Sequence, residues 1–309
     1  MALEGNHSSG HDKNFIIRQA QSLDDLQWVL KLATEEGWAP REKEAEYFFL
    51  AGLTTGFYIG ELNGERIGCF GLIKHEPTVA SAGFHIVAEP YRGQGYGKKL
   101  LEYALTITEG WQISQFTPEF TKEMYQGMGY KVGWNVRQYH FTVSSAIEGL
   151  ASSKVPPSVE ILPASQGDFE KIFTYSADML GTSRTCRSSL AAWLCYLQES
   201  SWVAVANKRE VVGLLMMSRT SRFPEEGYHI GPFYADSAPI ARSLLKVAVD
   251  FARASNPGHI FLRLPVDRNP EGVKILENEI GAECVIELVF MTNGEIPKKC
   301  LSKVYSGSG

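Results

Sequence analysis

Three glycines alternate with other residues in the stretch Arg92-Gly-Gln-Gly-Tyr-Gly97. Glycine tolerates left-handed backbone conformations and carries no side chain, so consecutive backbone N–H groups can point at one anion. Residues 98–108 then have helical spacing, and the N-terminus of a helix adds the positive end of its dipole. The stretch therefore predicts a loop that binds phosphate.

Two common phosphate-binding motifs do not fit this spacing. A P-loop needs a glycine five residues before a Gly-Lys pair and a Ser or Thr after it, but Arg92 and Lys99 hold those positions. A Rossmann fingerprint needs its third glycine three residues after the second, where Lys98 stands, and it opens the first βα unit of a domain. Here the loop follows a hairpin and a third strand.

Helices and strands that position the loop can be predicted from the residues before it. Ser22 followed by Asp25 is typical of a helix start, and Asn63-Gly64 between two apolar runs is typical of a type I′ hairpin turn, which needs positive φ twice. The expected elements are helices over 22–37 and 42–50 and strands over 56–62, 66–73 and 80–87.

The motif R-x-x-G-x-G after a strand that ends in Val87 resembles the acetyl-coenzyme A signature of the GNAT N-acetyltransferase superfamily. A second segment, Tyr125-Gln-Gly-Met-Gly-Tyr130, is similar to the family's downstream Y-x-x-x-G-F segment. The resemblance covers residues 14–143 and implies transfer of an acetyl group from acetyl-coenzyme A to a primary amine, by direct attack in a ternary complex. A covalent cysteine route is disfavoured because no cysteine lies near either motif.

The resemblance also implies which residues hold the cofactor. Arg92 is expected to order the loop or to neutralise charge. The backbones of Ile86 and Val87 are expected to bind the pantetheine arm and the thioester carbonyl. Backbone N–H groups are expected to cradle the pyrophosphate at Gly93, Gln94, Gly95, Tyr96, Gly97 and Lys98. The family often has an asparagine seven residues before its tyrosine, but Pro118 stands there, so that contact is lost or replaced.

Acid and base are needed because a lysine-like amine must lose a proton before it attacks, and the departing thiolate must gain one. Tyr125 occupies the family's usual acid position. Strict alternation places Ser81, Gly83, His85 and Val87 on one strand face, and His85 has the pKa range of a base at neutral pH. A structural role for His85 is the alternative, with Glu61, Glu76 or water as the base.

The acceptor site is predicted from a single residue. Trp38, in Gly37-Trp-Ala-Pro40, resembles a segment of a tandem GNAT subgroup and is expected to wall the amine pocket, although a plain core tryptophan is the alternative. The acceptor is expected to be a small molecule rather than a protein. The alternative function is a sensor or scaffold module that binds acyl-coenzyme A through the same loop but catalyses no transfer. Transfer of acyl chains longer than acetyl also stays open.

The second half of the chain repeats the order of elements without the alternate glycines. Its counterpart of the loop is expected at Gly231-Pro-Phe-Tyr-Ala-Asp236, and its helices include 166–180, 190–198 and 239–254. We therefore predict an α/β (α+β) tandem GNAT fold with a mixed sheet flanked by helices in each half. The expected divisions are a catalytic domain over 14–143, a linker over 144–158 and a degenerate, non-catalytic domain over 159–305.

Composition excludes several classes of protein. With 309 residues, 44% of them hydrophobic, the chain is long enough for two globular domains. Residues 1–150 hold 13 Lys+Arg against 18 Asp+Glu, which accounts for the whole net charge of −5, and no basic block favours nucleic acid. Five scattered cysteines favour thiols over disulfides or a metal site. With no membrane or targeting segment expected, we predict a cytoplasmic protein whose oligomeric state stays open.

Overall fold

The structure is a computed structural model. It describes residues 14–38, 40–52, 56–180, 194, 197, 200–207, 209–220, 227–255, 258–296 and 300–306. The expected helix over 190–198 lies almost wholly outside these residues, as do Cys186 and Cys195. Cys69, Cys284 and Cys300 are free thiols.

The first half contains six strands and five α-helices within its described residues. The strands are β1 (Phe15–Gln19), β2 (Phe57–Leu62), β3 (Glu65–Glu76), β4 (Val79–Val87), β5 (Gln112–Pro118) and β6 (Lys131–Thr142). The helices are α1 (Leu23–Glu35), α2 (Glu44–Leu50), α3 (Tyr96–Ile107), α4 (Lys122–Gly127) and α5 (Val143–Gly149).

The second half repeats this order in its described residues. Its strands are β7 (Val159–Pro163), β8 (Ser201–Ala206), β9 (Glu210–Thr220), β10 (Gly227–Ala235), β11 (His259–Pro265), β12 (Glu283–Thr292) and β13 (Val304–Ser306). Its helices are α6 (Phe169–Leu180), α8 (Ala238–Ala254) and α9 (Pro270–Val273), which continues as a π-helical segment, Lys274–Ile280.

The local signals at the start of the chain are confirmed. Ser22 caps α1, its Oγ accepting a hydrogen bond from the backbone N–H of Asp25 at 3.2 Å. Asn63 and Gly64 both have positive φ, 53° and 82°, between the paired strands β2 and β3. Cap and turn chemistry act within a few residues, so the sequence predicts them well.

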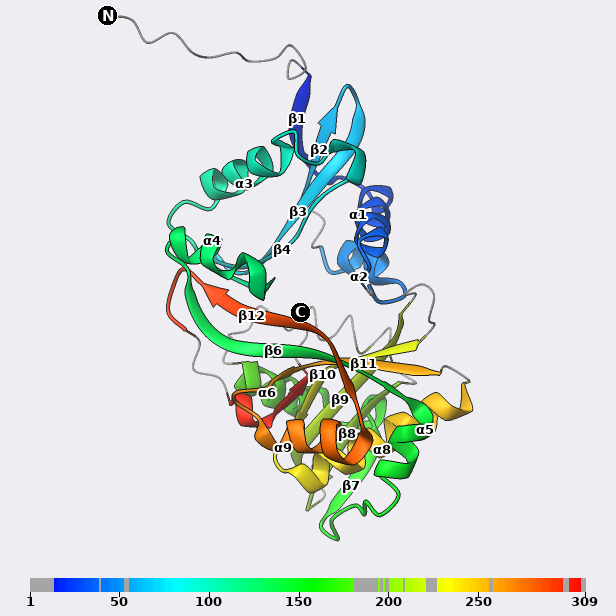
Figure 1. Cartoon of the computed structure of the whole chain (residues 1–309). Coiled ribbons are helices and arrows are strands. Elements are labelled where there is room, and N and C mark those ends of the chain that lie inside the picture. The colour runs from blue at the N-terminus through cyan, green and yellow to red at the C-terminus, as the bar shows by residue number, and fades with distance from the viewer. Residues whose placement is uncertain are drawn as a thin grey trace, which may run out of the picture.

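One continuous sheet runs through both halves, in the order β1-β2-β3-β4-β5-β12-β6-β11-β10-β9-β8-β7. One strand of each half lies in the other half's part of the sheet: β12 pairs with β5 and β6, and β6 pairs with β11 and β12. Figure 1 shows β6 and β12 crossing the middle of the molecule side by side. Each half is therefore completed by a strand from the other.

Helices cover both faces of this sheet. Helices α1, α2 and α6 share one hydrophobic core on the face that we call the α1 face, and this core draws residues from both halves. On the opposite face, which we call the α3 face, α3 and α4 cover the first half and α5 and α8 the second.

The second half differs from expectation at its counterpart of the glycine loop. Residues 231–235 are not a loop but the end of β10, and the peptide bond between Gly231 and Pro232 is cis. Apolar side chains at Phe233 and Tyr234 bury this segment in the two cores, so it continues as strand. The expected linker, 144–158, begins inside α5.

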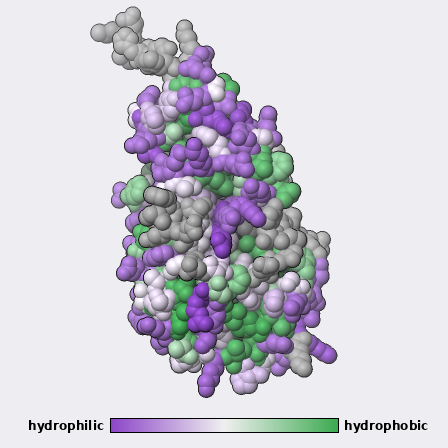
Figure 2. All heavy atoms as spheres, turned by 90° about the vertical axis from the view of Figure 1, so that its right-hand side faces the viewer, coloured by the Kyte–Doolittle hydropathy of each residue, from purple (hydrophilic) through white to green (hydrophobic). Residues whose placement is uncertain are grey.

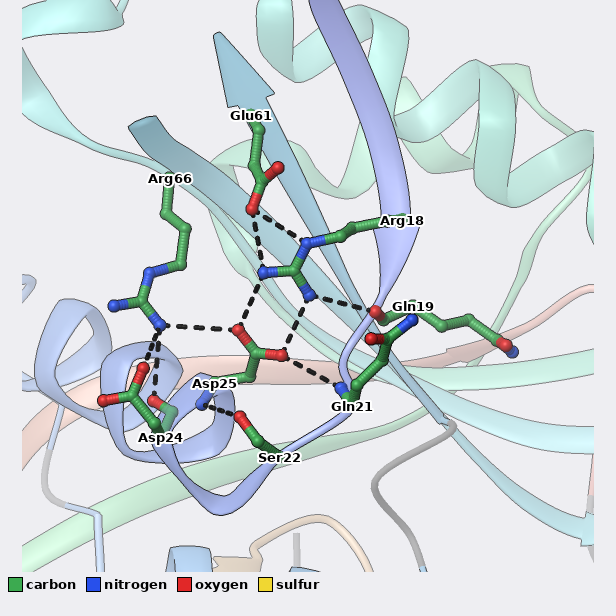
Figure 3. Close-up of polar contacts among 8 residues, drawn as sticks. All are labelled: Arg18, Gln19, Gln21, Ser22, Asp24, Asp25, Glu61 and Arg66. Carbon is green, nitrogen blue, oxygen red and sulfur yellow. Dashed lines mark hydrogen bonds and ion pairs between the residues drawn. The ribbon is translucent and has the colours of Figure 1, made fainter. Parts of the chain in front are cut away.

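An ion-pair network holds the first strands to α1 (Figure 3). Arg18 of β1 contacts the carboxylates of Asp25 at 2.9 Å and Glu61 at 2.8 Å, and Arg66 of β3 contacts both Asp24 and Asp25. Asp25 is 5% exposed, and the Arg18 hydrogen bond lowers its pKa to about 2. The network ties the edge of the sheet to the helix beside it.

The surface seen from the α1–α2 side is mainly hydrophilic at the end formed by the first half, whereas hydrophobic residues gather toward the other end (Figure 2). This distribution agrees with the excess of Asp and Glu in residues 1–150. In the part of the chain that the structure describes, none of the helices has the length and apolar character needed to span a membrane.

Candidate active site

The strands β4 and β5 separate at the centre of the first half. They pair in parallel from Val79 and Gln112 up to Ala82 and Gln115, and no further pair follows. On its other edge, β4 stays paired with β3 as far as Val87. The last five residues of β4 therefore present a backbone edge toward a widening gap, the geometry in which an extended ligand can lie beside a strand.

The glycine loop lies directly beyond this edge. Gly93 and Gly95 have φ of 73° and 88°, and a Cβ at either position would meet no atom within 4 Å. The first helical hydrogen bond of α3 runs from the N–H of Lys99 to the carbonyl of Gly95 at 3.1 Å. The preceding N–H groups of the described loop, from Gly93 to Lys98, donate no backbone bond, so they remain available to an anion.

Arg92 fixes the start of this loop. Its Nε donates to the carbonyl of Val87 at 3.0 Å, and its guanidinium forms an ion pair with Glu36 at the end of α1. The side chain thus joins the loop to the last residue of β4. The role of Arg92 in ordering a cofactor loop stays a prediction.

Strict alternation predicts that His85 shares a strand face with Ser81, but in the structure the two side chains lie on opposite faces of the sheet. Phe84 has a φ of 53°, and the β3–β4 register shifts, with Gly71 opposite Gly83 and Cys69 opposite Ile86. This bulge inserts a residue and turns the following side chains over. Val87 consequently packs with the α3 core, and the prediction that it lies on the Ser81 face was wrong.

His85 lies against the first turn of α3 on the α3 face. Its Nε2 is 2.9 Å from the carbonyl of Gly97, which can only accept, so Nε2 carries the hydrogen. Burial of the ring among its neighbours lowers the His85 pKa and the Gly97 bond raises it, although part of the side chain stays exposed. His85 can therefore take up a proton only at Nδ1.

Tyr125 also lies on the α3 face, beside Gln115 at the root of the gap. Burial raises the Tyr125 pKa, and a polar contact with the Gln115 amide works against that rise. The Nε2 of Gln115 is itself buried without a hydrogen-bond partner of good geometry in the described chain. The phenol is therefore protonated at neutral pH, and Gln115 is a candidate site residue that sequence reasoning missed.

Trp38 and Phe84 form an aromatic contact on the α1 face, with ring centroids 5.4 Å apart. Phe84 also contacts Phe48 of α2 and Phe57 of β2, while Trp38 keeps 40% of its surface exposed. No sequence pattern indicated Phe84, because a bulky residue rarely adopts positive φ. Its contact with Trp38 reaches the end of β4 from the face opposite Tyr125.

The segment after Trp38 is held by the second half. Thr220 of β9 donates from Oγ1 to the carbonyl of Pro40 at 3.0 Å. The buried guanidinium of Arg41 donates to the carbonyl of Gly231 at 3.1 Å and lies 3.4 Å from Nδ1 of His229. Burial and two neighbouring arginines lower the His229 pKa well below its usual value, so the ring is neutral and accepts from Arg41.

The corresponding gap in the second half is filled by the chain itself. β10 and β11 pair in parallel only as far as Ile230 and Leu262, and β13 pairs with the end of β10. Ser306 Oγ donates to the carbonyl of Ile230 at 2.7 Å and accepts from the N–H of Arg263 at 3.2 Å. β13 thus occupies the opening that stays free between β4 and β5.

Three other residues from the sequence analysis, Pro118, Glu61 and Glu76, are not placed at the gap: two have contacts elsewhere, and the side chain of the third is not among those that the structure describes. Pro118 ends β5, and its carbonyl accepts from Thr121 Oγ1 at 2.8 Å. Glu61, a reserve base, is paired with Arg18, and the side chain of Glu76 lies outside the described part. No group of three metal-ligating side chains occurs among the described residues.

Comparisons with known proteins agree with this geometry. Residues 54–132 match the model of the acetyltransferase (GNAT) domain. Holothin acyltransferase of Pseudoalteromonas sp. (strain SANK 73390) is 25% identical over 230 residues, which span 74% of this chain and 72% of the relative.

Solved structures share the fold of the whole chain. One from Pyrococcus horikoshii has a TM-score of 0.70 at 15% identity, covering 99% of both chains. A tandem GNAT protein from the clavulanic acid biosynthesis pathway has a TM-score of 0.64 at 14% identity, covering 91% of this chain and 99% of that one. Residues 54–132 therefore match a GNAT acetyltransferase domain, and the chain shares the fold of a tandem GNAT protein.

Proposed function

We propose that this protein is an acyltransferase that transfers an acetyl group from acetyl-coenzyme A to the nitrogen of a primary amine, by direct attack in a ternary complex. The observation that carries the proposal is the gap between β4 and β5 with the glycine loop at its end and no pairing past Ala82 and Gln115. Trp38 and Phe84 lie on one face beside this gap and Tyr125 on the other, so we expect two ligands to meet in it from opposite sides.

The loop residues fit the phosphates of the cofactor. Open space over Gly93 and Gly95 leaves room for an anion, and the free N–H groups up to Lys98 supply its donors. Gln94, Tyr96 and Gly97 complete the proposed cradle, with Arg92 holding it to Val87. Acetyl-coenzyme A, when bound, supplies the activated thioester.

The backbone edge of β4 is proposed to hold the remaining length of the cofactor. Ile86 and Val87 use one edge to pair with Cys69 and Gly68 of β3, which leaves their other edge facing the gap. Main-chain donors at such an edge suit an extended amide-containing ligand, as in strand addition to a sheet. A donor that faces developing negative charge on oxygen contributes about 3 kcal/mol in other acyl-transfer enzymes.

Tyr125 is proposed as the proton donor to the leaving thiolate. Its Oη stays protonated because burial raises its pKa, and Gln115 sits beside it to hold its orientation. His85, the predicted base, lies on this same face with Nε2 committed to Gly97. We expect His85 to steady the first turn of α3, with any proton uptake confined to Nδ1.

The acceptor amine is proposed to approach from the α1 face, where Trp38 and Phe84 meet. Trp38 retains exposed surface and would wall the pocket. The segment that carries it is held by Arg41 and Thr220 contacts to the second half. The second half is thus proposed to shape the acceptor site while its own gap, filled by β13, binds no cofactor. A small-molecule amine and a cytoplasmic setting are part of this proposal.

The test measures release of free coenzyme A thiol from acetyl-coenzyme A with a panel of primary amines. Gly95→Glu places a carboxylate in the loop and should abolish cofactor binding. Gly110→Glu is its matched control, because Gly110 also has positive φ and open space but lies at the far end of α3. Equal binding by the two variants would contradict the loop assignment.

A second pair of variants tests the proton donor. Tyr125→Phe should lower kcat by roughly 100-fold, the lower end of what general acid catalysis supplies, without weakening cofactor binding. Tyr130→Phe, which removes the neighbouring phenol 5.5 Å away between ring centroids, should not lower kcat. Tight cofactor binding without transfer to any amine would favour a sensor module instead.

A further inference from the structure

A histidine and two serines form a polar cluster at the root of the gap. His75, near the end of β3, lies with Nε2 2.7 Å from Oγ of Ser81 on β4. Oγ of Ser81 is in turn 3.4 Å from Oγ of Ser114 on β5. The cluster therefore spans the three strands that border the point where β4 and β5 part.

Strand register explains why the three side chains meet. Ser81 and Ser114 are direct partners in the parallel pairing, one residue before its last pair. In β3, Lys74 lies opposite Ala80 and Glu76 opposite Val79, so His75 is the extra residue of a bulge. A bulged residue is released from the regular alternation, and the His75 side chain reaches the neighbouring Ser81.

The Ser81 hydroxyl lies on the α1 face, the side of the proposed acceptor. Ile73, directly opposite Ser81, packs in the core of α1 and α2, as does Phe84. Between Ser81 and Phe84 stands Gly83, where an added Cβ would meet no atom within 4 Å. The hydroxyl thus borders open space beside the aromatic residues of the acceptor face.

We propose that Ser81 and His75 form the proton relay that deprotonates the acceptor amine. The amine nitrogen gives its proton to Oγ of Ser81 while the Ser81 hydroxyl gives its own to Nε2 of His75. Charge and protons balance: a neutral amine and an imidazolium replace an ammonium ion and a neutral imidazole. Ser81 would contact the substrate, and His75 is a positioning residue that acts through it.

This assignment, which rests on the proposed function, places the two proton transfers on opposite faces of the sheet. Tyr125 is on the α3 face with the cofactor loop, and so is His85, whose Nε2 is held by Gly97. Ser81 and His75 lie on the face where the amine arrives. One side therefore supplies a proton to the leaving thiolate and the other removes one from the amine.

The test uses two probes that have nearly the same shape but differ in charge. At neutral pH 2-phenylethylamine is protonated and needs a base, whereas O-benzylhydroxylamine is already neutral. Ser81→Ala and His75→Gln should each lower kcat/KM for 2-phenylethylamine by roughly 100-fold, the lower end for a lost general base. Both variants should leave kcat/KM for O-benzylhydroxylamine unchanged, and Ser81→Thr, which retains a hydroxyl, should restore transfer to 2-phenylethylamine.

A control separates the relay from general damage to the fold. Ser255→Ala removes a hydroxyl at the end of α8 and should change neither probe. Equal losses with both probes would assign Ser81 and His75 a structural role and overturn the relay, as would unchanged transfer in both variants. Failure of the wild type with these probes and with the whole amine panel would overturn the proposed function itself, and the relay with it.

Discussion

Arg92 donates from Nε to the carbonyl of Val87 at 3.0 Å, joining the glycine loop to the last residue of the strand that precedes it. The same guanidinium pairs with Glu36 at the end of α1. Three elements that are separate in sequence thus meet at one side chain. Arg92 thus fixes the position of the loop relative to the edge of β4. The proposed cofactor must contact both the loop and this edge.

Replacing Arg92 should weaken cofactor binding. Arg92→Leu removes both contacts and the positive charge, and we expect the Kd for coenzyme A to rise about 10-fold, equivalent to roughly 1.4 kcal/mol. Arg92→Lys keeps the charge without the planar fork and should give a smaller rise. Isothermal titration calorimetry checks this order. A wild-type Kd in Arg92→Leu would show that the loop holds its shape without the arginine.

Gly95 and Gly97 should differ in how much stability the protein loses when each is replaced by alanine. Gly95 has a φ of 88°, so Gly95→Ala forces a left-handed backbone and should lower stability by about 1–2 kcal/mol. Gly97 has no such φ, and its added Cβ would meet Val87 at an ordinary 3.5 Å, so Gly97→Ala should fold normally. Urea unfolding of both variants measures the difference. Equal losses of unfolding free energy in the two variants would show that the positive φ of Gly95 does not explain why glycine is needed there.

Stability should fall in acid because of Asp25. Its pKa in the folded chain, about 2, lies below the ordinary 3.8, so the network with Arg18 stabilises the folded state above about pH 4. That contribution, about 2 kcal/mol, should be lost as the pH falls from about 4 to 2. Asp25→Asn should flatten this part of the curve of unfolding free energy against pH. Asp24→Asn, at a side chain that is 77% exposed, should leave the curve's shape intact.

Arg41 should be important for the contact between the halves. Arg41→Met removes a buried guanidinium from the carbonyl of Gly231 and from Nδ1 of His229, both in the second half. We expect a loss of about 1–3 kcal/mol in unfolding free energy, because a buried carbonyl loses its charged hydrogen-bond donor. Lys31→Met, on the exposed face of α1, is the control and should cost little. Denaturant titration would contradict this view if both variants unfolded alike.

The exchanged strands predict that neither half folds by itself. A fragment of residues 14–143 contains β5 and β6 but lacks β12, which lies between them. Two unpaired strand edges would then face solvent and favour aggregation. We expect the fragment to be insoluble or to lack cooperative unfolding, and co-expression with residues 144–309 to restore a soluble complex. A monomeric fragment with a sharp thermal transition would show that the first half is independent.

Much of the site was predictable because its determinants are local. The cap at Ser22, the turn at Asn63-Gly64 and the glycine loop depend on residues a few positions apart, and the structure has them where the sequence indicates. Short-range chemistry sets backbone conformation directly, so it can be predicted from the residues alone.

Alternation failed at Phe84 for a physical reason. A bulge adds one residue to one strand, and every later side chain in that strand changes face. Nothing in the residues 80–87 signals the insertion, because Phe84 adopts a conformation that its side chain disfavours. Its aromatic contacts with Phe48, Phe57 and Trp38 hold it there, and those contacts exist only in the folded chain.

By itself the sequence determined the elements, the glycine loop and the duplication, because turn, cap and periodicity signals act along neighbouring residues. Tertiary structure alone decided which residues meet across long separations. It exchanged β6 and β12 between the halves, filled the second gap with β13, and brought His75 to Ser81 at the root of the first. Strand order and register depend on burial and pairing across the whole sheet, and no short stretch of residues encodes them.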